Sequence, residues 1–449
     1  MIFTKDKSFY KNLFLLALPI ALQNLVTFSV NLTDGVMVGA LGDAAVSGMY
    51  MGNQVQTLLQ VFNAGVEGSI LILAAQYWGK RDTASIRKIV AIGMRFSVAV
   101  GLLLTLVCAL LPRQVISLFA PDEGIVGTGA EYLGIVCFSY VFFCITQSFI
   151  AGLRSVEVAR IGLYVSLCSL FTNIFLNYCL IYGKLGFPEY GVAGAAIATL
   201  IARVVETTII TLYVFLYDKR LGFRPRDLLS GDRLLLGDLI RYGLPILAGQ
   251  LVWAVNTMVS SAIMGRQSEE GSVAAMSIAQ TINSLAYVCM NGMSGAVGII
   301  TGKTIGAGRE DKMREYSKTV QIIFLMLGIF TGLTLYLLRD SFISLYDVSE
   351  AAVSEAVKYI NVIAVTMVGT CYQVSVLFGL VKSGGDISFV FKNDSFFVFV
   401  VVLPSAIIAT LLHAPAWVVF ACLKCDQILK CFVAIVKVNS YNWMKNLTR

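Results

Sequence analysis

Long apolar stretches separated by short polar loops follow one another along almost the whole chain. Each stretch is about twenty residues or longer, enough for a helix to cross the roughly 30 Å hydrocarbon core of a bilayer. Breaking the pattern at Gly, Pro and charged positions predicts an all-α polytopic membrane protein with twelve transmembrane helices. The predicted spans are 12–38, 45–78, 89–111, 128–151, 159–183, 191–217, 237–264, 272–302, 319–338, 353–381, 393–412 and 415–438.

The composition agrees with this pattern. Of the 449 residues, 57% are hydrophobic and 14% are charged, whereas soluble domains carry about 25% charged residues. The net charge of +7 does not indicate a nucleic-acid partner, because the basic residues are spread over short loops. We therefore expect a protein that resides in the lipid bilayer with almost no soluble part.

Lysine and arginine are concentrated in alternate loops. One set of loops is basic, and the opposite set holds little more than Arg113, Lys184, Arg266 and Arg339. The basic set comprises the N-terminal segment, 80–88, 154–160, 218–236, 309–318, 382–392 and the C-terminal segment. Because basic loops stay on the cytoplasmic side, we expect a multi-pass protein of the cell membrane with both termini in the cytoplasm.

The two halves of the sequence resemble each other. "LALPIAL" at 16–22 recurs as "YGLPILA" at 242–248, so Pro19 corresponds to Pro245. Gly39 corresponds to Gly265 with the same separation along the chain. This duplication predicts two six-helix bundles, 1–217 and 237–449, joined by a basic cytoplasmic linker at 218–236. Six spans per repeat imply a pseudo-two-fold axis along the membrane normal and a cleft suited to alternating access. A duplicated scaffold without transport and a passive channel are the simpler alternatives.

Several motifs in this order resemble the multidrug and toxic compound extrusion (MATE) family. They include "TDGVMVGALGDAAVSG", "AAQYWGKRD" and "NIFLNYCLIYGKLGFPEYGVAGAAIAT", and the likeness covers essentially the whole chain. The resemblance implies an antiporter that exports organic, often cationic, compounds in exchange for H⁺ or Na⁺. We expect it to act as a monomer, as a transporter and not an enzyme, and without a cofactor or ATP.

Asp34 lies near the end of the first apolar span, where a carboxylate is costly unless it has a function. Burial in a medium of low dielectric constant favours the neutral form of a carboxyl group, so such a group can take up and release a proton near neutral pH. By resemblance, Asp34 matches the acidic residue of the first MATE helix. The alternative interpretation is that Asp34 only caps or hydrates the outer end of its helix.

The fifth span carries Asn173 and Asn177 one turn apart, on one helical face. By resemblance, part of the family has a second acid at the position of Asn177, which cannot titrate here. Thr199 in the sixth span offers a further oxygen ligand for an ion. An equally good interpretation is that the two asparagines only form hydrogen bonds between helices.

Glu67 is a second carboxylate inside an apolar span, and it matches no family acid. We interpret it as a further ion-coupling group, as a carboxylate that attracts the substrate, or as a hydrated residue of the cleft. Arg203 with Glu206, and Asp426 with Lys430, have spacings that predict mutual neutralisation within a helix.

Substrate contact is expected from adaptable Met and aromatic side chains and from amides inside the spans. Most methionines in a membrane bundle serve only in packing. The candidate residues are Asn31, Gln54, Gln250, Asn256, Met258, Gln280, Asn283, Tyr287 and Met290.

Other functions have weaker support in the sequence. "GIITGKT" at 298–304 has three residues between its glycines instead of the four of a phosphate loop, so it does not predict ATP binding. Cys422, Cys425 and Cys431 lack a further ligand, and no metal site is expected. His413 is the only histidine, which disfavours a lipid-modifying enzyme. A lipid-linked glycan or metabolite flippase of the same superfamily remains the alternative transporter.

Overall fold

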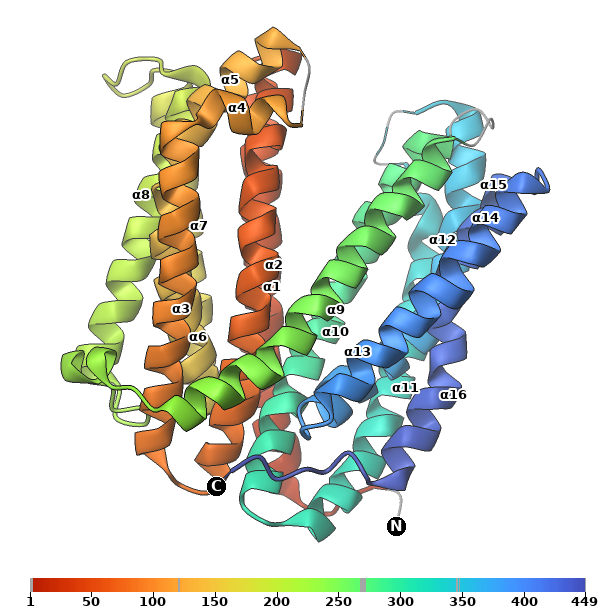
Figure 1. Cartoon of the computed structure of the whole chain (residues 1–449). Helices are drawn as coiled ribbons and strands as arrows, with labels where there is room; N and C mark the ends of the chain where they lie inside the picture. Colours follow the sequence, from red (N-terminus) through yellow and green to blue (C-terminus); the bar gives the residue numbers. More distant parts are fainter. Residues whose placement is uncertain (1–2, 120–121, 267–271, 345, 347, 449) are drawn as a thin grey trace. The chain divides into compact units, whose positions relative to one another are not determined.

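The computed structural model describes residues 3–119, 122–266, 272–344, 346 and 348–448, which are almost entirely helical (Figure 1). The internal contacts divide the chain into an N-terminal unit, residues 22–247, and a C-terminal unit, residues 1–21 and 248–449. α1 (Lys7–Gly39) and α9 (Arg233–Gly265) contribute to both units. Each is divided two residues after a proline, Pro19 in α1 and Pro245 in α9, so the boundaries repeat the internal spacing of the sequence.

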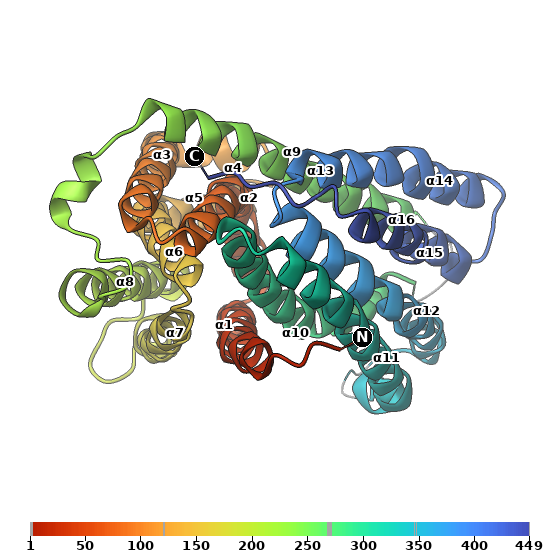
Figure 2. The same cartoon turned by 90° about the horizontal axis from the view of Figure 1, so that it is seen from below.

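In the N-terminal unit, α2 packs against α3, α5 and α6, while α7 packs against α8 (Figure 2). Gly194 permits the α7–α8 approach, because a Cβ atom there would lie 2.5 Å from the Leu180 carbonyl oxygen. Besides parts of α1 and α9, the elements are α2 (Asp43–Gly79), α3 (Thr83–Leu110), α4 (Pro112–Ser117), α5 (Glu123–Val136), α6 (Ser139–Ser155), α7 (Arg160–Ile181), α8 (Gly191–Leu212), the π-helical η1 (Tyr213–Tyr217) and the 3₁₀-helical η2 (Pro225–Leu229).

In the C-terminal unit, α12 packs against α10, α11 and α16. Gly332 of α11 faces the Ala364 carbonyl oxygen, which would lie 2.5 Å from an added Cβ atom. The elements besides parts of α1 and α9 are α10 (Ser272–Gly306), α11 (Glu310–Ile343), α12 (Glu350–Val374), η3 (Ser375–Lys382), α13 (Ile387–Phe396), η4 (Phe397–Val402), α14 (Leu403–Leu411), α15 (Ala416–Lys424) and α16 (Asp426–Ser440), of which η3 and η4 are π-helical.

In the described part of the chain, ten helical segments are long and apolar enough to cross a membrane, and α5 with α6 forms an eleventh. These two helices are bent by 52° at a short break, so the predicted fourth span is not straight. The predicted twelfth span corresponds to α15 and α16, which Cys425 separates. Lys424, Asp426 and Lys430 make this passage more polar than the others.

Candidate functional site

Asp34 lies in a cluster of polar side chains within the N-terminal unit. The Asn177 amide of α7 donates a hydrogen bond to Asp34 of α1, with 2.6 Å between Nδ2 and Oδ1. The same amide group contacts Asn173 Oδ1 at 3.2 Å, and Asn173 is also within hydrogen-bonding range of the Asp34 carboxylate. Both asparagines are buried and Asp34 is half-buried. The predicted asparagine face of α7 therefore meets the predicted acid.

Tyr132 of α5 links two further elements to this cluster. Its hydroxyl group donates to Asn53 Oδ1 of α2 at 3.2 Å and also forms a hydrogen bond with Thr199 of α8. Asp34 lies within electrostatic reach of the same phenol. Thr199 thus joins the neighbourhood of Asp34 through a buried tyrosine, which the sequence analysis did not select. A tyrosine in an apolar span is the only sequence signal for it.

Arg203 and Glu206 form the predicted ion pair, with 2.8 Å between Nη1 and Oε2. Glu206 is buried, and the guanidinium group of Arg203 also lies over the Phe143 ring, 5.3 Å from its centroid. Arg203 is close enough to act electrostatically on Asp34. Because Glu206 neutralises the positive charge of Arg203, Arg203 does not need Asp34 as an ion-pair partner.

Glu67 belongs to a different group of residues. Its electrostatic partner is Arg154 of α6, whose Nη2 atom donates to Gln23 Oε1 of α1 at 2.7 Å. Asp34 lies in the last two turns of α1, whereas Glu67 follows the start of α2 by more than six turns. The structure therefore places Glu67 apart from the Asp34 cluster.

The predicted substrate residues differ in how accessible they are. Asn31 is exposed and Gln54 half-buried in the N-terminal unit. In the C-terminal unit, Met258 and Gln280 are exposed, and Gln250, Asn256, Asn283 and Tyr287 are half-buried. Tyr287 forms a hydrogen bond with Thr370, and Met290 lies in the buried core.

A buried ion-pair cluster joins α13 and α16 in the C-terminal unit. Lys430 Nζ lies 2.9 Å from Asp394 Oδ1 and 3.0 Å from Asp426 Oδ2. The second contact is the predicted pairing, whereas the contribution of Asp394 was not predicted. Lys382 of η3 also acts electrostatically on Asp394. Hydrogen bonds continue from Asp426 through Gln427 to Gln373 of α12.

A protein-family model named MatE matches this chain twice, at residues 19–179 and 245–408. The chain belongs to the MatE family. The two matches begin at Pro19 and Pro245, the positions that mark the two halves in the sequence, and they confirm the internal duplication.

Among MatE relatives, the chain is similar to proteins described as probable multidrug resistance protein NorM. The relative from Thermotoga maritima is 27% identical over 342 residues, covering 75% of this chain and 72% of the relative. The relative from Photorhabdus laumondii is 28% identical over 417 residues, covering 89% of this chain and 88% of the relative.

Solved structures of MOP superfamily and MATE family transporters share this fold. A MOP superfamily transporter from Pyrococcus furiosus superposes with a TM-score of 0.87 at 21% identity, covering 98% of both chains. An outward-facing multidrug resistance MATE family transporter gives a TM-score of 0.86 at 20% identity, covering 98% of this chain and 99% of the other. The predicted fold class, twelve transmembrane helices in two six-helix bundles, is confirmed. As a member of the MatE family with many membrane-spanning helices, this protein is a multi-pass membrane transporter, not an enzyme.

Proposed function

We propose that this protein exports organic, mainly cationic, multidrug-type compounds from the cytoplasm in exchange for H⁺, with Na⁺ as the alternative coupling ion. The relatives described as multidrug resistance proteins support the substrate class. Alternating access with Asp34 as the coupling carboxylate is the mechanism that we infer. In this proposal both termini face the cytoplasm, the membrane is the cell membrane, and the protein acts as a monomer without a cofactor or ATP.

The contact between Asp34 and Asn177 carries the proposal. An amide stays neutral when the carboxylate gains or loses a proton, so Asp34 can change its charge without a compensating change in Asn177. Asn177 Oδ1 is buried without a hydrogen-bond partner in the described structure. A protonated carboxyl group can donate to that oxygen, and Na⁺ would be coordinated by it. Asp34, Asn173, Asn177 and Thr199 together supply the oxygen ligands for either ion.

Substrate contact is proposed at side chains of each unit taken separately. Asn31 and Gln54 belong to the N-terminal unit, and the larger set belongs to the C-terminal unit. That set comprises Gln250, Asn256, Met258, Gln280, Asn283, Tyr287 and Met290. Met258 is 73% exposed, and its flexible thioether can adapt to varied ligands. Met290 is the buried member of the proposed set.

Glu67 is proposed to act separately from Asp34, through its pairing with Arg154. Protonation of Glu67 would remove the negative charge that balances Arg154. Arg154, which donates a hydrogen bond to Gln23 of α1, would then carry a positive charge that Glu67 no longer neutralises. A Glu67→Gln variant reproduces this neutral state. We expect it to transport with an altered dependence on pH while retaining coupling through Asp34.

Dye transport in everted membrane vesicles tests the proposal. The cytoplasmic face is outward in such vesicles, so export appears as uptake of a fluorescent cation such as ethidium. An imposed pH gradient should drive uptake by the wild type, and Asp34→Asn should reduce uptake to the level of vesicles without the protein. Asp43→Asn is the matched control, because Asp43 is an exposed acid in the first turn of α2.

Two other results of the dye-uptake experiment would contradict parts of the proposal. Uptake driven by a Na⁺ gradient would favour the oxygen-lined cation site over proton transfer. Absence of uptake under either gradient, with Asp34→Asn behaving like the wild type, would overturn both the substrate class and the role of Asp34.

A further inference from the structure

A cavity of about 440 Å³ lies in the N-terminal unit, between α3 and the residues that lead into α9. This volume is within the range of small-ligand sites. The cavity lies where the predicted cytoplasmic linker contacts α3, and none of its lining residues belongs to the Asp34 cluster. Its lining residues are Ile92, Arg95, Phe96 and Ala99 from α3, and Gly231, Asp232, Arg233 and Leu236 from the linker and α9.

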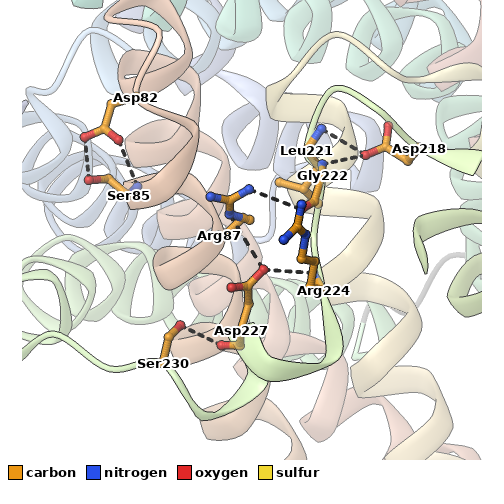
Figure 3. Close-up of polar contacts among 9 residues, drawn as sticks. All are labelled: Asp82, Ser85, Arg87, Asp218, Leu221, Gly222, Arg224, Asp227 and Ser230. Atoms are coloured by element: carbon orange, nitrogen blue, oxygen red, sulfur yellow. Dashed lines mark hydrogen bonds and ion pairs between the residues drawn. The ribbon is translucent and has the colours of Figure 1, made fainter. Parts of the chain in front are cut away.

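The linker is fixed against α3 by contacts that use its acidic groups. Asp227 accepts a hydrogen bond from the Arg224 main-chain N–H at 2.8 Å and pairs with Arg87 of α3 at 3.6 Å (Figure 3). Arg87 also donates to the Gly222 carbonyl oxygen at 3.2 Å. Asp232 pairs with Lys88 at 3.4 Å. These contacts hold the wall of the cavity in place and occupy the carboxylates of Asp227 and Asp232.

The two arginines that line the cavity have no carboxylate partner in the described part of the chain. Arg95 donates to the carbonyl oxygens of Ser230 and Ala91, both of which are neutral acceptors. Arg233 is exposed, and the described structure gives it no ion pair. Because Lys88 neutralises Asp232, the cavity has a positive charge and unused guanidinium donors.

An apolar strip continues from the cavity along α3. Phe96, Leu103, Leu106 and Leu110 are 43%, 60%, 57% and 69% exposed. Their spacing places them on one helical face, and they extend for about 21 Å. One leaflet of the hydrocarbon core is roughly 15 Å thick. The strip lies within the predicted span 89–111 and is longer than one leaflet, so it is long enough to accompany an acyl chain.

We propose that this cavity binds the phosphate head group of an anionic phospholipid of the cytoplasmic leaflet, with an acyl chain along the α3 strip. Guanidinium groups match phosphate geometry with paired hydrogen bonds, and basic pockets at the cytoplasmic side of helices suit anionic lipids. Leu229 and Leu234, which are 86% and 61% exposed, lie close in sequence to the lining residues Gly231 and Arg233 and favour a lipid over a free anion. Since Arg95 contacts Ser230, a bound lipid would also hold the linker against α3.

Native mass spectrometry of the full-length protein in detergent tests this site independently of transport. The wild type should retain phosphatidylglycerol in preference to phosphatidylcholine. The Arg95→Gln/Arg233→Gln double variant should lower retention of phosphatidylglycerol by roughly tenfold and abolish the preference. Arg226→Gln is the matched control, because Arg226 is an exposed arginine of the same linker that does not line the cavity. It should behave like the wild type.

A single variant and a soluble competitor distinguish binding of a whole lipid from binding of its phosphate group alone. Arg233→Gln alone should lower retention without disturbing the fold, since the Arg233 side chain makes no hydrogen bond or ion pair in the described part of the chain. Glycerol phosphate should compete poorly, and equal competition by this soluble anion would overturn the role of the acyl chain. The proposal also fails if the double variant retains phosphatidylglycerol like the wild type, or if Arg226→Gln loses as much as the double variant.

Discussion

The carboxylate of Asp34 on α1 and the amide of Asn177 on α7 are joined by a hydrogen bond of 2.6 Å. Asn173, Thr199 and Tyr132 surround this pair with further neutral polar groups. Arg203, the cation that acts on Asp34, is already neutralised by Glu206. The cluster therefore contains one acid that is free to change its charge, and the composition of its neighbours should determine which ion it exchanges.

Asn177→Asp tests this dependence by placing a second acid beside Asp34. Two carboxylates this close share one proton unless a cation lies between them. We expect the variant to require Na⁺ for transport, or to respond to it far more strongly than the wild type. Dye uptake in everted vesicles under separate Na⁺ and pH gradients measures the change. Asn177→Leu, which removes the amide donor without adding charge, is the control and should not gain a response to Na⁺.

Glu206→Gln should destabilise the N-terminal unit and impair transport. Removing one partner of a buried ion pair costs about 3–5 kcal/mol, because the other charge is left unbalanced. Arg203 would then act on Asp34 without opposition and favour its charged form. The Arg203→Met/Glu206→Met double variant should recover most of the stability. Thermal unfolding in detergent and ethidium uptake measure the two effects, and a double variant less stable than Glu206→Gln would contradict this account.

The sequence predicted contacts that depend on helical spacing better than contacts that depend on packing. Arg203–Glu206 and Asp426–Lys430 follow from spacings of three and four residues, and both ion pairs are present. Asp394 also pairs with Lys430, but it comes from another helix, and no periodicity indicates which helices touch.

The site shows the same division. The shared face of Asn173 and Asn177 follows from the helical repeat, whereas their meeting with Asp34 was expected only through the family resemblance. Tyr132 was missed because a buried tyrosine in an apolar span looks like an ordinary core residue. The bend between α5 and α6 was also missed, since the residues around Cys137 include no proline to predict it.

Lys430→Met should be the most damaging change in the C-terminal unit. Two carboxylates, Asp394 and Asp426, would lose the ammonium group that they share, and the expected loss of stability is about 3–5 kcal/mol. Asp394→Asn should cost less, because Lys430 keeps Asp426 as a partner. Thermal unfolding of the purified variants shows which of the two substitutions lowers the stability more. Equal losses for the two variants would show that Lys430 does not hold the two carboxylates together.

Asp6 should make the anchoring of the N-terminal segment depend on pH. Hydrogen bonds from the Ser8 hydroxyl group and from the Tyr316 hydroxyl group, the latter 2.6 Å long, lower the pKa of Asp6 to about 2. A lowered pKa contributes stability that is complete above the ordinary value of 3.8 and is lost as the pH falls toward 2.

Asp6→Asn should therefore destabilise this anchor at pH 7 by about 1 kcal/mol, after allowance for solvent screening. The difference from the wild type should shrink between about pH 5 and pH 2. Hydrogen exchange of residues 3–10 measures the local effect, and Tyr316→Phe, which removes one donor, should show a smaller change of the same sign. A difference between wild type and Asp6→Asn that grows on acidification would mean that the hydrogen bonds favour the protonated carboxyl group instead.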